Sequence, residues 1–250
     1  MSAGKLSEQA LTEKARGVYI IAATPFTEEG ALDLQSIDTL TDFYLGCGVH
    51  GFTLLGMMGE AHKLTAEESL SVVGRVIGRA QGRQVIVGVS HAGVENVRRL
   101  SHEDAPGLAK LTRVREGEKK PGRRRVSILV GNGGLYLPQE MRRGADGAMT
   151  GFAWPEMLVQ VYELFAAGKT EEAENLFDIY LPLVRHEQQP AIGLALRKEV
   201  LFRRGAIKSP RQRAPGSSLT AADRAELDGL VQRLERRLAA SGRAIKVAAE

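Results

Sequence analysis

The sequence has a single cysteine, Cys47, among its 250 residues, and only 5% of the residues are aromatic. One cysteine excludes an intramolecular disulfide and is typical of a reducing compartment. Glycines flank Cys47 and no base lies next to it in the sequence, so we interpret it as a packed helix end and not as a nucleophile. The hydrophobic content of 43% and the charged content of 26% are ordinary for a globular protein.

Long hydrophobic runs are also missing. No stretch approaches the roughly 20 apolar residues of a membrane span, so we expect no membrane partner. Residues 1–17 contain no apolar segment of the kind that secretory signals carry, and we expect them to form an N-terminal tail, with a second tail at 241–250. Together with the single cysteine, these features predict a cytoplasmic protein.

The net charge of +4 is unevenly distributed, because a cluster of basic residues supplies the excess. Its members are Lys110, Arg113, Arg115, Lys119, Lys120, Arg123, Arg124 and Arg125. Basic clusters can bind nucleic acid, but here no aromatic side chain is interleaved for base stacking, and Pro121-Gly122 interrupts the run. We interpret the cluster as a solvated helix end and loop and expect no nucleic-acid partner.

The most informative stretch is Gly51–Glu68, which predicts a strand, a loop and a helix in succession. The apolar run Phe52–Leu55 is typical of a buried strand. Thr65 followed by Glu68 is a helix N-cap pattern with acidic residues in the first turn. The loop Gly56–Glu60 therefore lies at the carboxyl end of a strand, where parallel α/β folds bind ligands, although an ordinary connecting turn has the same pattern.

The rest of the chain repeats this alternation and then changes. Buried strands are predicted at 18–24, 52–55, 84–90, 126–130 and 148–150, with helices between them. Continuous apolar strands that alternate with helices predict a parallel sheet covered by helices. After the last strand come only helices, predicted at 155–167, 170–188, 191–205 and 220–240. We therefore expect a partial (β/α) barrel over 18–155 and a C-terminal helical extension over 156–240.

Several ordered motifs resemble one family. They are ATPF at 23–26, the stretch 48–68 with its G-x-x-G-E loop, Leu129–Asn132 and GADGAMTG at 144–151. This pattern resembles the dihydrodipicolinate synthase / N-acetylneuraminate lyase family. The resemblance implies a (β/α)8 TIM barrel and lyase or aldolase chemistry, through a Schiff base between a lysine and pyruvate or another 2-keto acid.

Two departures from the family pattern affect the expected chemistry. Met57 and Met58 stand where the resemblance implies two threonines that hold the carboxylate of the keto acid, and a thioether cannot donate a hydrogen bond. The predicted strands are also about five, although a closed barrel needs eight. The shortfall lies near Ser101 and His102 and implies an internal deletion of the fourth and fifth βα units and the sixth strand.

The deletion removes the catalytic residues that the resemblance implies. The Y-x-x-P tyrosine is absent, and Ser101 occupies the place of the imine-forming lysine. An imine requires a primary amine. Among the other lysines Lys63, just past the loop, is the nearest substitute, and we assign no catalytic residue.

Three functional classes remain open. The first is a lyase or aldolase that acts on pyruvate or a 2-keto sugar acid. The second is a catalytically impaired relative, either a keto-acid-binding protein or the product of an internally deleted gene. The third is a metal-dependent lyase that uses His102, Glu103 and Asp104, which we disfavour because adjacent side chains rarely converge on one ion. We assign no metal and no cofactor.

If a ligand pocket is retained, we expect it at the carboxyl ends of the strands. Its candidate residues are Thr24, Gly56, Met57, Met58, Gly59, Glu60, Asn132, Met149 and Thr150. Asn132 offers an amide to a hydroxyl or carboxylate, and by resemblance Met149 stands where the backbone contacts the keto acid. Glu60 is expected to brace the loop through backbone N–H groups.

An incomplete barrel leaves strand edges exposed, and exposed edges promote association. We therefore predict an open sheet that is prone to self-association. Family members are commonly tetramers, so a homo-oligomer is a further expectation that rests on the resemblance. Because the missing segment would contact the second substrate, the sequence does not identify the substrate.

Overall fold

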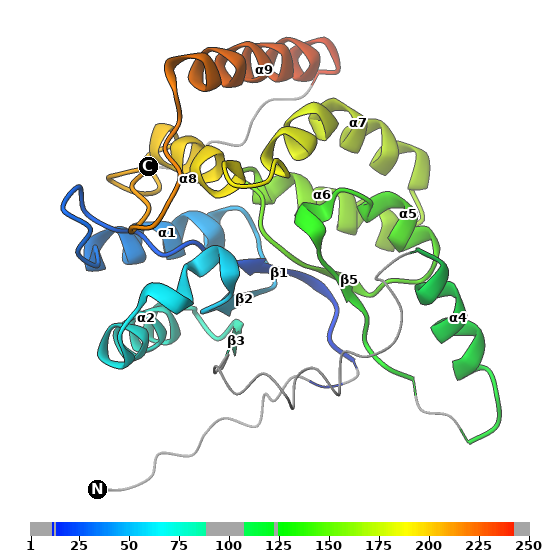
Figure 1. The fold of residues 1–250 in the computed structure, drawn as a ribbon. Helices are drawn as coiled ribbons and strands as arrows, with labels where there is room; N and C mark the ends of the chain where they lie inside the picture. The colour runs from blue at the N-terminus through cyan, green and yellow to red at the C-terminus, as the bar shows by residue number, and fades with distance from the viewer. Residues whose placement is uncertain (1–11, 13, 89–107, 123–124, 243–250) are drawn as a thin grey trace, which may run out of the picture.

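The computed structural model describes residues 12, 14–88, 108–122 and 125–242. Within these residues, helices cover a parallel five-stranded sheet (Figure 1). Its order is β3-β2-β1-β5-β4, so the first strand lies at the centre and pairs with the last. The strands are β1 (Gly17–Ile21), β2 (Gly51–Leu54), β3 (Gln84–Val87), β4 (Leu129–Val130) and β5 (Gly147–Thr150).

The helices lie between the strands and after β5, as predicted, and those after β5 follow the predicted ranges to within a few residues. They are α1 (Leu34–Gly46), α2 (Ala66–Arg79), α4 (Leu108–Glu118), α5 (Leu137–Arg142), α6 (Pro155–Ala166), α7 (Thr170–Glu187), α8 (Gly193–Arg203) and α9 (Ala221–Ala240). The described residues also form three short 3₁₀ turns, η1 (Met57–Gly59), η2 (Ala61–Lys63) and η3 (Asn132–Gly134). The sequence also predicts a helix at 93–101, and both this segment and the junction at Ser101 and His102 lie outside the described residues.

Local sequence explains where the first two helices begin. Asp33 accepts a hydrogen bond from the backbone N–H of Ser36 and caps α1. Thr65 and Glu68 form a capping box at α2, in which each side chain accepts from the backbone N–H of the other residue. Both caps provide hydrogen-bond acceptors for backbone N–H groups that have no partner within the helix.

The described strands do not close into a barrel. Among the described strands, β3 and β4 each have one neighbour and form the two edges, and they do not pair with each other. Over the described ranges the fold is therefore α/β, with an incomplete barrel of five parallel strands and additional helices after β5.

The fourth strand is shorter than the sequence predicts, because side chains replace part of its ladder. Of the predicted 126–130, only Leu129–Val130 pairs with β5. The backbone N–H of Val126 donates to the Glu118 carboxylate, and that of Ile128 donates to the Asp146 carboxylate.

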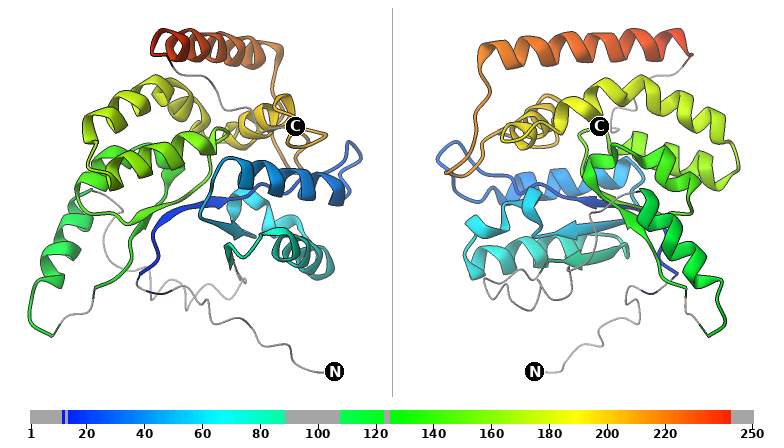
Figure 2. Two further views of the ribbon diagram at one scale, coloured as in Figure 1. Left: turned by 180° about the vertical axis from the view of Figure 1, so that it is seen from behind. Right: turned by 45° about the vertical axis from the view of Figure 1, so that its right-hand side comes forward.

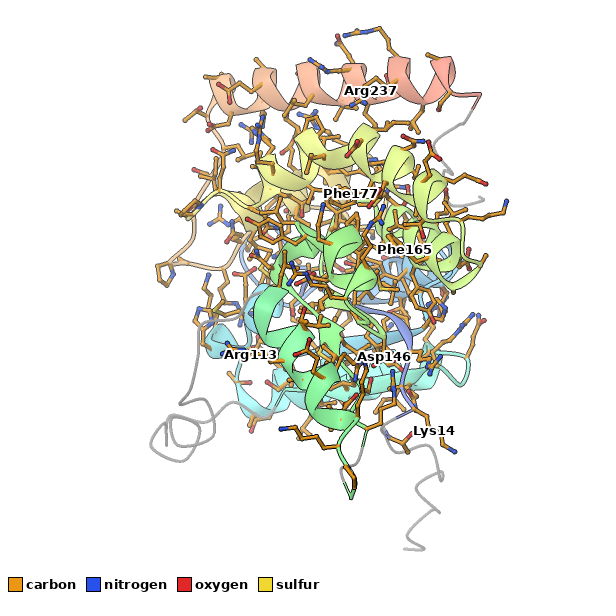
Figure 3. All side chains as sticks on the ribbon, turned by 90° about the vertical axis from the view of Figure 1, so that its right-hand side faces the viewer. Lys14, Arg113, Asp146, Phe165, Phe177 and Arg237 are labelled. Atoms are coloured by element: carbon orange, nitrogen blue, oxygen red, sulfur yellow. The ribbon has the colours of Figure 1, made fainter. Side chains whose placement is uncertain are left out.

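The C-terminal helices stack in layers on one side of the sheet (Figure 2). α6 packs against β1, α7 packs against α6, and α9 is the outermost helix. Figure 3 shows α9, with Arg237 labelled, over α7, with Phe177 labelled. The Arg237 guanidinium donates to the backbone carbonyl of Asp178 at 2.8 Å. The buried face of α9 consists of Leu227, Leu234 and Leu238.

Candidate functional site

An open cleft lies at the carboxyl ends of β1 and β5 and has a volume of about 660 Å³. Ile21 and Met149–Gly151 form its floor, because they end these two strands. Its other walls come from η1 and η2, from the turn at 131–133, and from the end of α7 and the start of α8. Ligands of parallel α/β folds bind at this edge of the sheet.

The loop between β2 and α2 contributes the side chains of Met57, Met58, Glu60, His62 and Lys63 to the cleft. Glu60 joins the two 3₁₀ turns in a left-handed conformation, with φ of 52°. Met57 is 84% exposed, so a large apolar side chain faces solvent at the entrance. The thioethers offer no hydrogen-bond donor to a ligand.

Glu60 is buried and connects this loop to the C-terminal part of the chain. Its Oε1 accepts from Lys198 Nζ at 2.6 Å, and its Oε2 accepts from Lys63 Nζ at 2.8 Å. The backbone N–H of Arg213 also donates to Oε2, at 3.1 Å. Glu60 thus braces the loop through three donors. The Lys63 amine belongs to the same loop, and the Lys198 amine and the Arg213 N–H group come from distant parts of the chain.

The two amines differ in their surroundings. Lys198 is fully buried on α8, and burial lowers the pKa of its amine to about 8, although the Glu60 carboxylate opposes this change. Lys63 lines the cleft, and its amine donates to Glu60 and to the carbonyl of Arg213 at 2.8 Å. The only cleft lysine among the described residues is therefore held by two acceptors.

Arg197 and Glu187 form a second buried ion pair in the cleft wall. Arg197 Nε donates to Glu187 Oε1 at 2.5 Å, and Nη2 donates to the carbonyl of Gly151 at 2.7 Å. The other Glu187 oxygen accepts from the N–H of Ala153. Burial raises the pKa of the Glu187 carboxyl, and the Arg197 guanidinium opposes that effect.

Sequence reasoning missed Arg197 and Glu187, because periodicity assigns both to ordinary helices. A signal was present in the charged run Arg197–Glu199, which interrupts the apolar helix α8. Residues 197–199 are all buried, which is unusual for charged side chains and requires partners.

The turn after β4 forms the opposite wall. Asn132 lies in η3 with φ of 53° and is exposed at the cleft. The Gln188 side chain lies over Gly133, where any larger residue would collide with it. The cleft thus has amide groups from Asn132, Gln188 and Gln189 in addition to its charged groups.

The structure brings six of the nine candidate residues to this cleft. They are Met57, Met58, Glu60, Asn132, Met149 and Thr150. Thr24, Gly56 and Gly59 do not line it. The Thr24 hydroxyl is buried and donates to the carbonyl of Gly59 at 2.6 Å, so this side chain supports the loop from behind.

Other features concern metal, membrane and thiol chemistry. In the part of the chain that the structure describes, no group of three or more His, Cys, Asp or Glu side chains could hold a metal ion, and His102–Asp104 lie outside that part. Within the same ranges, none of the helices combines the length and apolar character that crossing a bilayer requires. Cys47 is buried, and its thiol contacts Glu156.

Comparison with known proteins gives consistent relatives. Residues 14–114 match the model of the dihydrodipicolinate synthetase family. The crystal structure of dihydrodipicolinate synthase from Rhodopseudomonas palustris is 40% identical, with a TM-score of 0.83. That match covers 89% of this chain and 99% of the other chain.

Curated relatives extend the comparison. L-2-keto-3-deoxyarabonate dehydratase from Azospirillum brasilense is 24% identical over 90% of this chain and 96% of its own length. The alignment spans 297 residues, more than the chain contains, so a substantial part of the relative has no counterpart here. 4-Hydroxy-tetrahydrodipicolinate synthase from Laribacter hongkongensis is 40% identical over 73 residues, which cover 29% of this chain and 25% of its own length.

Proposed function

Because the chain belongs to the dihydrodipicolinate synthetase family and keeps a cleft at the carboxyl ends of its strands, we propose that it binds a 2-keto acid without forming an imine. The cleft supports binding, because it combines the Arg197 guanidinium with amide groups that can bond a carboxylate and a carbonyl. The names of the relatives, a synthase and a 2-keto-3-deoxy acid dehydratase, support the choice of ligand class.

The observation that carries the proposal is that no lysine amine of the cleft is free to form an imine among the described residues. Serine stands at position 101, where family resemblance implies the imine-forming lysine. Lys63, which lines the cleft, donates to the Glu60 carboxylate and to a backbone carbonyl, so its nitrogen is engaged in hydrogen bonds. A nucleophilic lysine must instead be neutral and free to attack a carbonyl carbon. The arrangement therefore supports ligand binding and not covalent catalysis.

The test combines binding with chemical trapping. We expect titration calorimetry to show saturable binding of pyruvate, and of 2-keto-3-deoxyarabonate as a longer 2-keto acid. We expect treatment with borohydride in the presence of either compound to leave the intact mass unchanged. Trapping detects any imine that forms, even transiently, because reduction makes it permanent.

Two results would contradict the proposal. A mass increase equal to the reduced adduct would show that an imine forms, and the variant Lys63→Arg would show whether Lys63 forms it. Arginine keeps the positive charge beside Glu60 but is not a primary amine. The lack of binding by a folded protein at millimolar ligand would reject the binding function itself.

A further inference from the structure

We propose that Arg197 is the carboxylate receptor of the cleft and that it binds the ligand through Nη1. This inference rests on the proposed function, because it assigns one end of the 2-keto acid to a residue of the C-terminal helices. It places the recognition of the negative charge on α8, away from the loop of Met57 and Met58.

The guanidinium is held in place with one nitrogen unsatisfied. Glu187 accepts from Nε and the carbonyl of Gly151 accepts from Nη2. Nη1 is buried and has no hydrogen-bond partner among the described residues. Arg197 is only 2% exposed, yet it forms part of the cleft wall.

We expect Nη1 of Arg197 to have a hydrogen-bond acceptor when the protein is functional. Buried side-chain donors are nearly always hydrogen-bonded, and an exception calls for an explanation. A charged donor that is removed from water and left unpaired destabilises the protein. A ligand carboxylate would satisfy Nη1 with a charge-assisted hydrogen bond.

The backbone next to Arg197 is shaped for close approach. Gly151 directly follows β5, and a Cβ atom at this position would collide with Nη1. The absence of a side chain therefore lets the guanidinium lie over the end of the central strands. This is the place where the cleft meets its floor.

The charges of the surrounding wall favour an anion. Glu60 is paired with two cations, Lys63 in the cleft wall and the buried Lys198 behind it, so these three charges leave an excess of one positive charge next to the cleft. Glu187 is paired with Arg197, and Glu68 with Arg213, which neutralises these groups one for one. A singly charged carboxylate would balance the excess.

The part of the loop at 57–60 cannot supply the same interaction with its side chains. Met57 and Met58 have no donor groups, and Glu60 is itself an acceptor that is already engaged. Among the described side chains of the cleft, Arg197 thus combines a positive charge with a donor that has no partner.

The first measurement uses the wild-type protein, so that folding is not in question. Pyruvate and pyruvamide have the same shape, but the amide carries no charge. We expect calorimetry to show binding of pyruvate at least about 10-fold tighter than that of pyruvamide, since a hydrogen bond to a charged group contributes that much. Inorganic phosphate is the second probe, because it offers the same charged oxygens from another source.

The second measurement uses variants of the ion pair. We expect Arg197→Gln to weaken pyruvate binding about 10- to 100-fold and to bring pyruvate and pyruvamide to similar affinities. Because this variant leaves Glu187 buried without its partner, the double variant Glu187→Gln/Arg197→Gln is measured beside it and should show the same loss. Circular dichroism establishes that each variant is folded.

Arg204→Gln is the matched control. Arg204 lies directly after α8 and pairs with the buried Glu156, but it does not line the cleft. It should reduce stability in a similar way and leave the affinity for pyruvate unchanged.

The outcomes separate the two proposals. If wild type binds pyruvate and the folded Arg197 variants bind it equally well, the role of Arg197 is rejected and the binding function stands. If phosphate binds more tightly than pyruvate, the assignment to a carboxylate is rejected. If wild type binds neither keto acid nor phosphate, both proposals are rejected.

Discussion

At the scale of single residues, Glu60 shows how a buried charge can hold a loop. Its carboxylate is 1% exposed and accepts from two lysines and one backbone N–H. Buried ion pairs add little stability compared with apolar residues of equal size, but the loss of one partner leaves the other charge buried and uncompensated. The energetic importance of Glu60 therefore appears most clearly when it alone is removed.

We expect Glu60→Ala to lower the free energy of unfolding by about 3–5 kcal/mol, because Lys198 would remain buried without a counter-charge. Urea unfolding measures this change. The double variant Glu60→Ala/Lys198→Met should recover part of the loss, since it removes the stranded amine as well. A double variant no more stable than the single one would contradict this explanation.

Lys198 also predicts a dependence of stability on pH. Its pKa is about 8 in the folded protein, below the ordinary value of 10.5. Between these values the unfolded chain binds more protons than the folded one, so the contribution of Lys198 to stability rises with pH. We expect wild type to gain stability relative to Lys198→Met from pH 8 to pH 10.5, measured by urea unfolding. A constant difference would contradict the lowered pKa.

Cys47 illustrates a buried thiol without reactivity. Burial raises its pKa to about 12, and the Glu156 carboxyl beside it acts in the same direction. Since the thiolate is the reactive form, we expect iodoacetamide at pH 8 to leave the folded protein unlabelled and to label it fully in 6 M guanidinium, as read by intact mass. Rapid labelling of the folded protein would show that the thiol is accessible.

At the scale of elements, α2 follows the cleft loop, and two sets of interactions stabilise its N-terminus. Thr65 and Glu68 form the capping box, and the Arg213 guanidinium donates two hydrogen bonds to Glu68 at 2.7 Å. The bond from Arg213 and the N–H of Thr65 lower the pKa of Glu68 to about 2. The start of this helix is thus fixed by the C-terminal segment as well as by its own sequence.

We expect Thr65→Ala to lower the free energy of unfolding by about 1 kcal/mol, the usual effect of losing an N-cap. Thermal and urea unfolding measure the change. Ser71→Ala on the same helix is the matched control, because that hydroxyl donates only to the carbonyl of Glu67 within the helix. A loss no larger than that of the control would show that the cap contributes nothing.

At the scale of the whole molecule, the open sheet predicts uneven protection. β1 is paired on both sides, whereas β3 and β4 each have one neighbour among the described strands. We expect amide hydrogen exchange to be slowest in β1 and faster in β3 and β4, because an edge strand opens without disturbing the sheet. Uniform protection of all strands in a monomer would contradict an open sheet.

The same edges predict association. Unpaired N–H and C=O groups along a strand can pair with another chain. We expect sedimentation velocity to show a species whose size increases with concentration over the micromolar range. A single monomeric species over that range would show that the edges are protected from pairing.

Much of this architecture could be predicted from the sequence, because local patterns determine it. Apolar runs and helical stripes located the strands and helices, and Thr65 with Glu68 marked the start of α2. The pairing of side chains could not be predicted in this way. Arg197 meets the carbonyl of Gly151 across 46 residues, and Lys198 meets Glu60 across 138 residues, distances at which periodicity carries no information.

The long separation between Glu60 and its partners has a consequence for biosynthesis. Lys198 follows it by 138 residues and Arg213 by 153, so the cleft loop is still without these partners when the first half of the chain leaves the ribosome. The loop therefore acquires these partners only after residue 213 has been translated. A nascent chain arrested before residue 197 would hold the strands of the cleft but not the braced loop, and it would have no Arg197 to receive an anion.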